Sequence, residues 1–319
     1  MKFLTPACLR AALASILIAA PLSQAAPVKS EHIDSTAKWM VHLDINALLK
    51  TDIAQHALEQ NKQLSGQKLE ALKNIIGIDL KTQLHGATLF GNGQPDNAVV
   101  IIHADAKPDN LVNFAKLNDA YKEEKFQDFI IHSLPDEKKP GKRNHICFYS
   151  SNKVVVAPSA DSVKLGVELL NGSRESIAVN GEMEKLGDFQ ETPVLIAYGD
   201  FSSLQKGKGK KAETFKQAKR IGLSLGEVNG YIKGGLAVVT ENAEVATQIE
   251  SFLRGVIAIG QLGRENNPAL ATLADAMKVT KSEADIISVE MQMPTATLIE
   301  IGETMKNQKK KKKSEKAAE

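Results

Sequence analysis

Residues 39–50 read WMVHLDINALLK, and a reduced copy of this stretch, LIAYGDFSSLQK, returns at residues 195–206. In each copy a short apolar strand reaches an aspartate, which is followed by a large apolar residue and a short polar one. That polar residue, Asn46 in the first copy and Ser202 in the second, can accept a hydrogen bond from free N–H groups of a following helix. The pattern predicts a strand that leads into a helix, twice, and marks where two similar units begin.

The elements after each copy follow a similar order, in which hairpins are separated by helices. The clearest hairpin has strands at residues 84–90 and 98–103, joined by a stretch rich in Gly, Asn, Pro and Asp. Strands that arrive as hairpins with helices between them favour antiparallel or mixed sheets covered by helices. We therefore predict an α+β fold of two tandem, duplicated units, each built from such a sheet.

The composition of successive segments predicts the boundaries of these units. They are a signal peptide at 1–25, a first α+β unit at 26–173, a linker at 174–188, a second α+β unit at 189–306 and a disordered Lys-rich tail at 307–319. Helices are predicted at 46–61, 67–76, 159–170, 244–262, 268–277 and 295–306, with a further helix opening at Pro108. Other strands are predicted at 126–132, 146–157 and 286–293, and as a pair within 221–240, broken at Asn229-Gly230 and Gly234-Gly235.

The first residues have the pattern of a secretory signal peptide. Lys2 and Arg10 flank an apolar run at 11–20, and small residues follow at Ser23 and Ala25. We expect cleavage after Ala25, export to the periplasm or the extracellular space, and no transmembrane span after cleavage. An uncleaved N-terminal membrane anchor is the alternative.

Removal of the signal peptide leaves a mature chain with balanced charge. The full chain has 40 basic and 38 acidic residues, and the signal peptide holds two of the basic ones. Residues 306–319 hold seven lysines and two glutamates, which leaves a body with 31 basic and 36 acidic residues. A mildly acidic body does not suit specific nucleic-acid binding, which needs a basic face.

Cys147 is the single cysteine expected in the mature chain. It alternates with Ile146 and Phe148 on a predicted strand, and an exported protein with one cysteine cannot form an internal disulfide. We expect a buried, inert thiol, with an intermolecular disulfide or a reactive thiol as alternatives.

Three short stretches carry a resemblance to known proteins. They are AKWMVHLD at 37–44 with Ala47 and Leu48, GID at 77–79 and LHGATLFG at 84–91. In these stretches the chain resembles uncharacterised secreted bacterial proteins of the domain-of-unknown-function kind. The resemblance implies an exported α+β protein and carries no activity.

Enzymatic motifs in the sequence lack their necessary context. Residues 222–226 read GLSLG, the G-x-S-x-G pattern of a nucleophile elbow, which needs a later histidine base. All seven histidines precede residue 146. There is also no H-E-x-x-H motif, no paired cysteine and no phosphate-binding loop, so we expect no metal or cofactor.

One group of polar residues could still form a catalytic site. His42 and Asp44 share one face of their strand by period-two spacing, and His103 and Asp105 do the same after the first hairpin. If the fold brought these strand ends together, the four side chains could serve a hydrolase. The alternative is that they are solvated or hydrogen-bonded residues at strand ends.

The C-terminal tail contains a run of lysines. The run comprises Lys309, Lys310, Lys311, Lys312 and Lys313, and the basic stretch at 206–211 could add to the same patch. Outside the cytoplasm such a run suits anionic lipid or acidic polysaccharide. A solubilising tail without a partner is the alternative.

Together these features favour an exported, non-enzymatic binding or structural protein of the cell envelope or extracellular space. The alternative is a hydrolase of unrecognised type with its site in the first unit. A third hypothesis is an accessory protein whose apolar helix at 245–262 docks on a protein partner. An exposed apolar stripe on that helix would favour docking, whereas convergence of His42 and His103 in a pocket would favour the enzyme.

Overall fold

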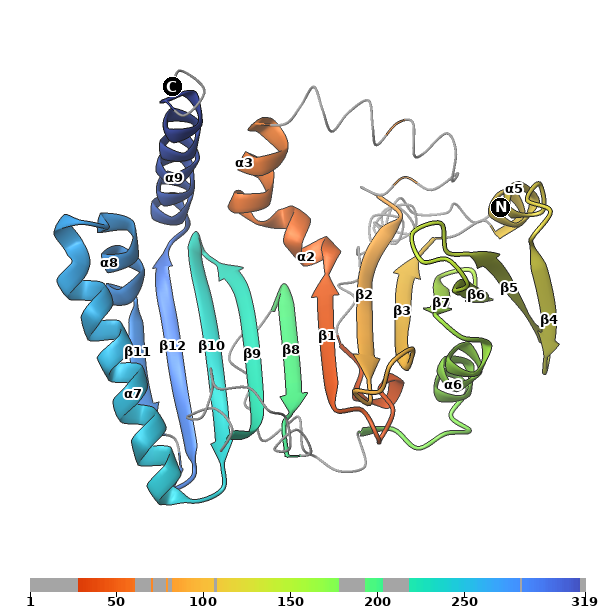
Figure 1. The fold of residues 1–319 in the computed structure, drawn as a ribbon, viewed down its shortest axis with the longest axis horizontal. Coiled ribbons are helices and arrows are strands. Elements are labelled where there is room, and N and C mark those ends of the chain that lie inside the picture. The colour runs from red at the N-terminus through yellow and green to blue at the C-terminus, as the bar shows by residue number, and fades with distance from the viewer. Residues whose placement is uncertain are drawn as a thin grey trace, which may run out of the picture.

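The computed structural model of the protein describes residues 28–60, 70, 79, 82–105, 108–177, 193–202, 218–281 and 283–315. The strands form one large antiparallel sheet, with helices packed on it and along its edges (Figure 1). The α+β class is therefore confirmed. The signal peptide, all but residue 70 of the helix at 67–76, the basic stretch at 206–211 and most of the linker lie outside the described residues.

The elements are named as in Figure 1. The first half holds η1 (Ser30–His32), β1 (Trp39–Asp44), α2 (Ile45–Lys50), α3 (Asp52–Gln60), β2 (Leu84–Gly91), β3 (Ala98–Ala104), α5 (Pro108–Ala115), β4 (Lys122–Phe126), β5 (Phe129–Pro135), β6 (Arg143–Ser150), β7 (Lys153–Ala157) and α6 (Ala160–Leu170). The second half holds β8 (Leu195–Asp200), β9 (Ala218–Val228), β10 (Tyr231–Thr240), α7 (Ala243–Leu262), η5 (Gly263–Glu265), α8 (Pro268–Asp275), β11 (Met277–Lys281), β12 (Ile286–Pro294) and α9 (Thr295–Glu315).

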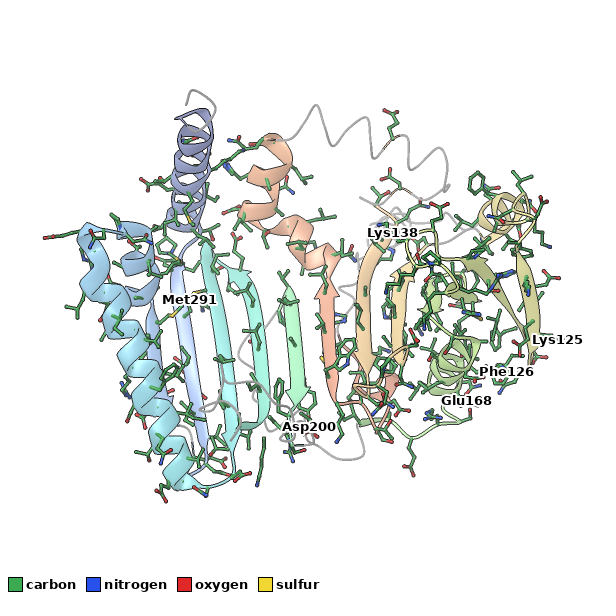
Figure 2. The ribbon with its side chains drawn as sticks, viewed as in Figure 1. Lys125, Phe126, Lys138, Glu168, Asp200 and Met291 are labelled. Atoms are coloured by element: carbon green, nitrogen blue, oxygen red, sulfur yellow. The ribbon has the colours of Figure 1, made fainter. Side chains whose placement is uncertain are left out.

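The two halves join edge to edge in a single sheet. The 12 strands that the described residues form lie in the order β11-β12-β10-β9-β8-β1-β2-β3-β7-β6-β5-β4. The halves meet where β1 pairs antiparallel with β8, with Met40 opposite Tyr198. Near the lower end of β8, Lys38 Nζ lies 2.9 Å from Asp200 Oδ2 and links the halves a second time (Figure 2).

The main core lies between α6 and one face of the sheet. Met40, Phe90 and Val99 are directly opposite one another on β1, β2 and β3. Opposite residues of antiparallel strands point to the same face, so all three enter one core, where each is at most 2 % exposed. Helix α6 approaches this face closely because Gly166 lies against Val155, where a Cβ would come within 2.6 Å of a methyl group.

Helix α7 covers the opposite face in the second half. Ala237 of β10 belongs to the main core, and its neighbour Val238 points to the other face because side chains alternate along a strand. Val238 lies opposite Ile287 of β12. Both are buried in a second core with three residues of α7, which are Val245, Ala246 and Ile249.

The hairpin of β9 and β10 turns at Asn229 and Gly230, with φ of 52° and 75°. Two consecutive positive φ angles are typical of the type I′ turn, which suits the twist of a two-residue hairpin. This turn was predicted. The second predicted break is wrong, because Gly234 and Gly235 lie within β10 and pair with β9.

The helix after β1 is capped by Asp44, and the predicted cap at Asn46 is wrong. Asp44 Oδ1 accepts a hydrogen bond of 2.8 Å from the Ala47 N–H. The single helix predicted to follow is two helices, because Thr51 returns to extended geometry. The Thr51 hydroxyl then accepts a hydrogen bond of 3.2 Å from the Ala54 N–H, which starts α3.

Three further element boundaries differ from the prediction. The strand predicted at 126–132 spans the end of β4, the turn at 127–128 and the start of β5. The strand predicted at 146–157 is the hairpin of β6 and β7, whose turn at 151–152 contains neither Gly nor Pro. Strand β11 was missed because it begins two residues after α8, inside the predicted helix at 268–277.

Helix α9 corrects the prediction of a disordered tail from residue 307. Its backbone is helical from Thr295 to Glu315, through the whole lysine run. Lysine has a high helix propensity, and the run extends an existing helix without a new nucleation step, which offsets repulsion between the charges. In the described part of the chain, no helix has both the length and the hydropathy needed to cross a membrane.

Candidate functional site

In the structure, His42 and the two predicted aspartates each contact other residues of the fold. His42 is 1 % exposed on β1, and its Nδ1 lies 2.9 Å from the Thr88 hydroxyl oxygen. Asp44 is buried and caps α2. Asp105 is exposed, and its Oδ2 lies 3.2 Å from His85 Nε2. The two carboxylates thus have separate partners at the same strand end, because Asp44 lies opposite Gly86, the neighbour of His85.

The two predicted histidines do share a face of the sheet. His42 lies opposite Thr88, Thr88 lies opposite Ile101, and His103 is two residues beyond Ile101 on β3. His103 stacks on His32 of η1, with ring centroids 6.3 Å apart and planes 24° apart. Sequence reasoning missed His32, because it precedes the first strand and no spacing rule relates it to β3.

The environment of these histidines suits a structural role. Burial lowers the pKa of His103 to about 4, and the positive charges of His32 and Lys153 add to this effect. Burial also lowers the pKa of His32. A general base works best with a pKa near the working pH, so His103 would be a weak one. Among the described residues, no group of His, Cys, Asp and Glu is arranged to hold a metal ion.

Ser224, in the GLSLG motif, lies within a strand. A nucleophile elbow needs a sharp turn from strand to helix, whereas β9 continues through Val228. Ser224 is buried, and its hydroxyl has no hydrogen-bond partner among the described residues. The motif therefore belongs to the sheet.

Cys147 is buried on β6, as predicted. It lies opposite Ile131 and Val155 in the main core. Burial raises the pKa of its thiol to about 11, so the reactive thiolate is scarce at neutral pH.

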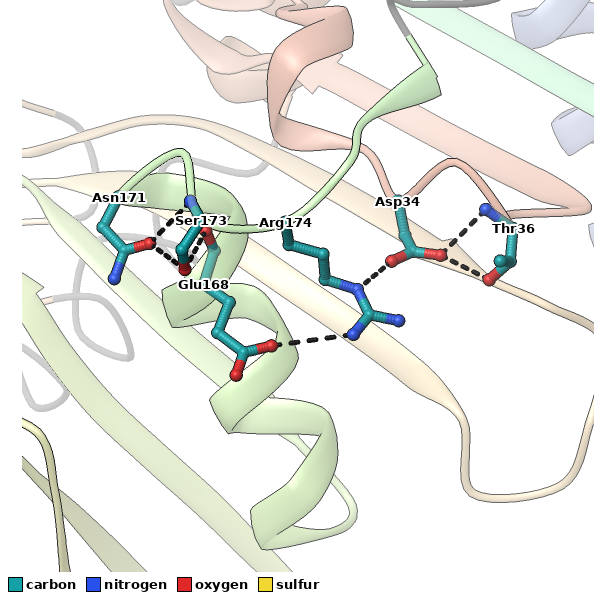
Figure 3. Close-up of polar contacts among 6 residues, drawn as sticks. All are labelled: Asp34, Thr36, Glu168, Asn171, Ser173 and Arg174. Atoms are coloured by element: carbon teal, nitrogen blue, oxygen red, sulfur yellow. Dashed lines mark hydrogen bonds and ion pairs between the residues drawn. The ribbon is translucent and has the colours of Figure 1, made fainter.

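An open recess of about 580 Å³ lies beside α6, and two cations, Lys164 and Arg174, line it. Lys164 Nζ lies 2.7 Å from Glu124 Oε1. Arg174 Nε donates to the Asp34 carboxylate, and its Nη1 lies 3.6 Å from Glu168 Oε2 (Figure 3). Because both cations are engaged by carboxylates of the protein, the recess does not suit an anionic ligand.

An exposed apolar flank of α7 is the strongest candidate for a functional surface. It exposes four apolar side chains, with exposure increasing towards the C-terminal end of the helix. These are Phe252 at 45 %, Val256 at 50 %, Ile259 at 71 % and Leu262 at 85 %, which we call the α7 ridge. Their spacing of four, three and three residues places them along one side of a helix.

This ridge flanks the side of α7 that holds the helix on the sheet, and the two overlap where Val256 follows Ile249 by seven residues. Val245, Ala246 and Ile249 are buried, and Leu253 and Ile257 pack partly against the same core. A surface helix normally has one apolar stripe, which faces the core. The ridge broadens this stripe beyond the buried residues, and its exposed part therefore calls for an explanation beyond the fold.

Helix α8 widens the ridge at its C-terminal end. A Cβ at Gly260 would come 2.9 Å from the Ala274 Cβ, so glycine allows α7 and α8 to pack closely. Leu270 of α8 is 49 % exposed beside this contact. Leu270 therefore adds exposed apolar surface beside the C-terminal part of α7.

The Lys-rich helix α9 starts near this end of α7. Ala276, just after α8, accepts a hydrogen bond of 3.1 Å from the Gln292 N–H, three residues before α9 begins. In Figure 1, α8 and α9 lie at the same edge of the sheet. Helix α3 contacts the side of α9 through polar side chains. Glu303 Oε1 of α9 lies 3.0 Å from His56 Nε2 of α3 and accepts a hydrogen bond of 3.2 Å from Gln60 of α3.

No protein-family model matches the chain. A search of curated proteins also gives no match. Among solved structures, crystal form I of TP0453 is similar over 86 % of this chain and 97 % of that one, with a TM-score of 0.45 and 10 % identity. Crystal form IV of TP0453 covers 88 % of this chain and 97 % of that one, with a TM-score of 0.45 and 8 % identity. Similarity below a TM-score of 0.5 supports no statement about function.

Proposed function

We propose that the chain is an exported, non-enzymatic protein of the cell envelope that docks on an anionic lipid surface. The α7 ridge enters the apolar boundary of the lipid, and the lysines of α9 provide attraction to its head groups. The exposure of the four ridge side chains, which reaches 85 % at Leu262, carries this proposal. A helix that lies in the membrane plane combines an apolar side with basic residues, and in this proposal the lysine run of α9 supplies the basic residues.

The expected contributions to the binding free energy favour lipid over a polysaccharide or a protein partner. Burying these four side chains, which are 45–85 % exposed, stabilises a complex by about 4–6 kcal/mol. Each lysine near an anionic membrane surface contributes roughly 1 kcal/mol. An acidic polysaccharide would use the lysines alone, and an ordinary protein partner would use the ridge alone. An anionic lipid surface uses both.

Export is proposed from the N-terminal pattern at 1–25 and from the resemblance to secreted bacterial proteins. Periplasmic or extracellular location follows from export. The absence of an enzymatic role is supported by the low pKa of His103, together with the contacts of Asp44 and Asp105.

We also propose that the two halves arose by duplication. Outwards from the junction, the first half has the strand order β1-β2-β3-β7-β6 and the second has β8-β9-β10-β12-β11. In each half a hairpin follows the first strand, the last strand returns beside the third, and a helix follows it. Strands β4 and β5 are then an addition to the first half.

The ridge is tested by vesicle sedimentation with the mature chain, residues 26–319. Replacing Ile259 and Leu262 together by aspartate should weaken binding to vesicles of phosphatidylglycerol and phosphatidylcholine by about 100-fold, because it removes apolar contact and adds repulsion. Binding of the unchanged chain should weaken as salt rises, because exposed charges are screened.

The matched control replaces Phe114 and Leu117 by aspartate. These residues at α5 are 59 % and 79 % exposed, but they lie away from the ridge. Their replacement should leave vesicle affinity unchanged within about twofold. The proposal fails if the unchanged chain does not bind vesicles, if the ridge variant binds equally well, or if both variants lose affinity to the same extent.

A further inference from the structure

Residues 28–37 form a strap that crosses from the N-terminal end of the described chain to β1. The strap contains η1 and packs on α6 and the main core, where Ile33 is fully buried. Its contacts are of two kinds, one on each side of Ile33.

The C-terminal part of the strap is held by a carboxylate and by backbone hydrogen bonds. Asp34 accepts hydrogen bonds from Arg174 Nε and from the N–H of Thr36, the latter at 2.8 Å (Figure 3). The Ser35 N–H donates to the Glu175 carbonyl at 3.2 Å, and the Ile177 N–H donates to the Ile33 carbonyl at 2.8 Å. This part is therefore clamped to the segment after α6.

The N-terminal part of the strap lies against β3 through the stacked rings of His32 and His103. The charged groups around this pair are mostly basic. Lys153 of β7 lies opposite His103 in the sheet, and Lys29 acts on both rings. The nearest acid to His32 is Glu31, 4.0 Å away with a side chain 66 % exposed, and the third titratable ring near His103 is that of His42.

We propose that the strap is released by acid: protonation of His32 and His103 separates residues 28–32 from β3, while the Asp34 clamp stays closed and acts as the hinge. Two positive rings stacked in a setting that already holds Lys153 and Lys29 repel one another. This device is independent of docking through the α7 ridge.

The direction of the pH dependence follows from the two protonation equilibria. Burial and the neighbouring charges lower the pKa of His103 to about 4 in the docked strap, and they also lower the pKa of His32. Once separated and hydrated, each ring titrates near its ordinary pKa of about 6.5. The separated state thus binds more protons below pH 6.5. At pH 4.5, the rise of the His103 pKa from about 4 to about 6.5 would by itself increase the equilibrium constant for release by up to about 80-fold.

The Asp34 clamp responds differently. Burial acts to raise the pKa of the Asp34 carboxyl, but the hydrogen bonds from Thr36 and Arg174 outweigh burial and hold the pKa below its usual value. Asp34 therefore stays ionised as the pH falls through the range in which the histidines become charged.

Amide hydrogen exchange at pH 7.0 and pH 4.5 tests the proposal on the mature chain. The N–H groups of His32 and Ile33 donate within η1 at 2.9 and 3.2 Å, and they should lose protection at pH 4.5. The Ser35 N–H should keep its protection. His103→Gln should keep the His32 and Ile33 amides protected at both pH values, whereas His56→Gln, which changes a histidine on α3, should behave like the unchanged chain.

A second measurement follows the histidine ring signals of the unchanged chain by NMR. The midpoint of His103 protonation should coincide with the loss of protection at His32. The proposal is overturned if protection at His32 and Ile33 is equal at the two pH values, if Ser35 loses protection together with them, or if His103→Gln releases the strap as the unchanged chain does.

Discussion

Replacing Arg174 by alanine is expected to lower the free energy of unfolding by about 2–3 kcal/mol at pH 7, measured by urea denaturation. The Asp34 side chain is only 4 % exposed, and Arg174 is its charged partner. Removal of one partner from a buried ion pair leaves an uncompensated buried charge, which typically costs about 3–5 kcal/mol. The expected value is lower because the Arg174 side chain is 37 % exposed, and water partly replaces its contribution.

The matched control for this variant is Arg264→Ala. Arg264 Nη2 lies 2.6 Å from Asp275 Oδ2, but both side chains are well exposed, at 57 % and 43 %. An exposed ion pair is worth about 0–1 kcal/mol, so this variant should unfold close to the unchanged chain. If the two arginine variants lost the same free energy of unfolding, burial of Asp34 would not be the cause of the effect.

Replacing Phe90 by alanine is expected to lower the free energy of unfolding by about 3–5 kcal/mol. Phe90 is 1 % exposed and lies between Met40 and Val99 in the main core. The loss combines the transfer energy of the ring with the cavity that the well-packed neighbours cannot fill. Urea denaturation measures the change directly.

Phe114→Ala changes the same residue type on the surface and serves as the control. Phe114 is 59 % exposed on α5, so its loss should change stability by about 0.5 kcal/mol or less. If Phe90→Ala were no more destabilising than Phe114→Ala, then the core assigned to this face of the sheet would be wrong.

Elements with a complete local signal could be predicted from the sequence. The hairpin of β2 and β3 was predicted because apolar runs flank a stretch of turn-forming residues. The start of α6 was predicted at residue 159, and Ser159 Oγ accepts the capping hydrogen bond from the Ser162 N–H at 3.1 Å. Such signals lie within a few residues of the feature that they specify.

Features that depend on distant contacts could not be predicted. Side chains alternate along β1, and the more apolar side holds Trp39, Val41 and Leu43. The buried side is nevertheless the other one, which holds Met40, His42 and Asp44. The pairing of β1 with β8 and the core beneath α6 determine which side is buried more deeply. Neither contact leaves a pattern in the local sequence.

The α7 ridge could be predicted in part from the sequence. The predicted helix at 244–262 matches α7, and its apolar residues exceed what one buried stripe requires. Which of those residues remain exposed depends on how α7 sits on β10, β11 and β12. The stacking of His32 on His103 depends in the same way on the path of the strap.

Insertion of the α7 ridge into lipid tests the central claim most directly. The chain has a single tryptophan, so Leu262→Trp in a Trp39→Phe background places one fluorophore at the most exposed ridge position. With anionic vesicles, its emission should shift to shorter wavelength, and lipids brominated in the acyl chains should quench it. An emission that stays unshifted and unquenched while the protein sediments with the vesicles would contradict docking through the ridge.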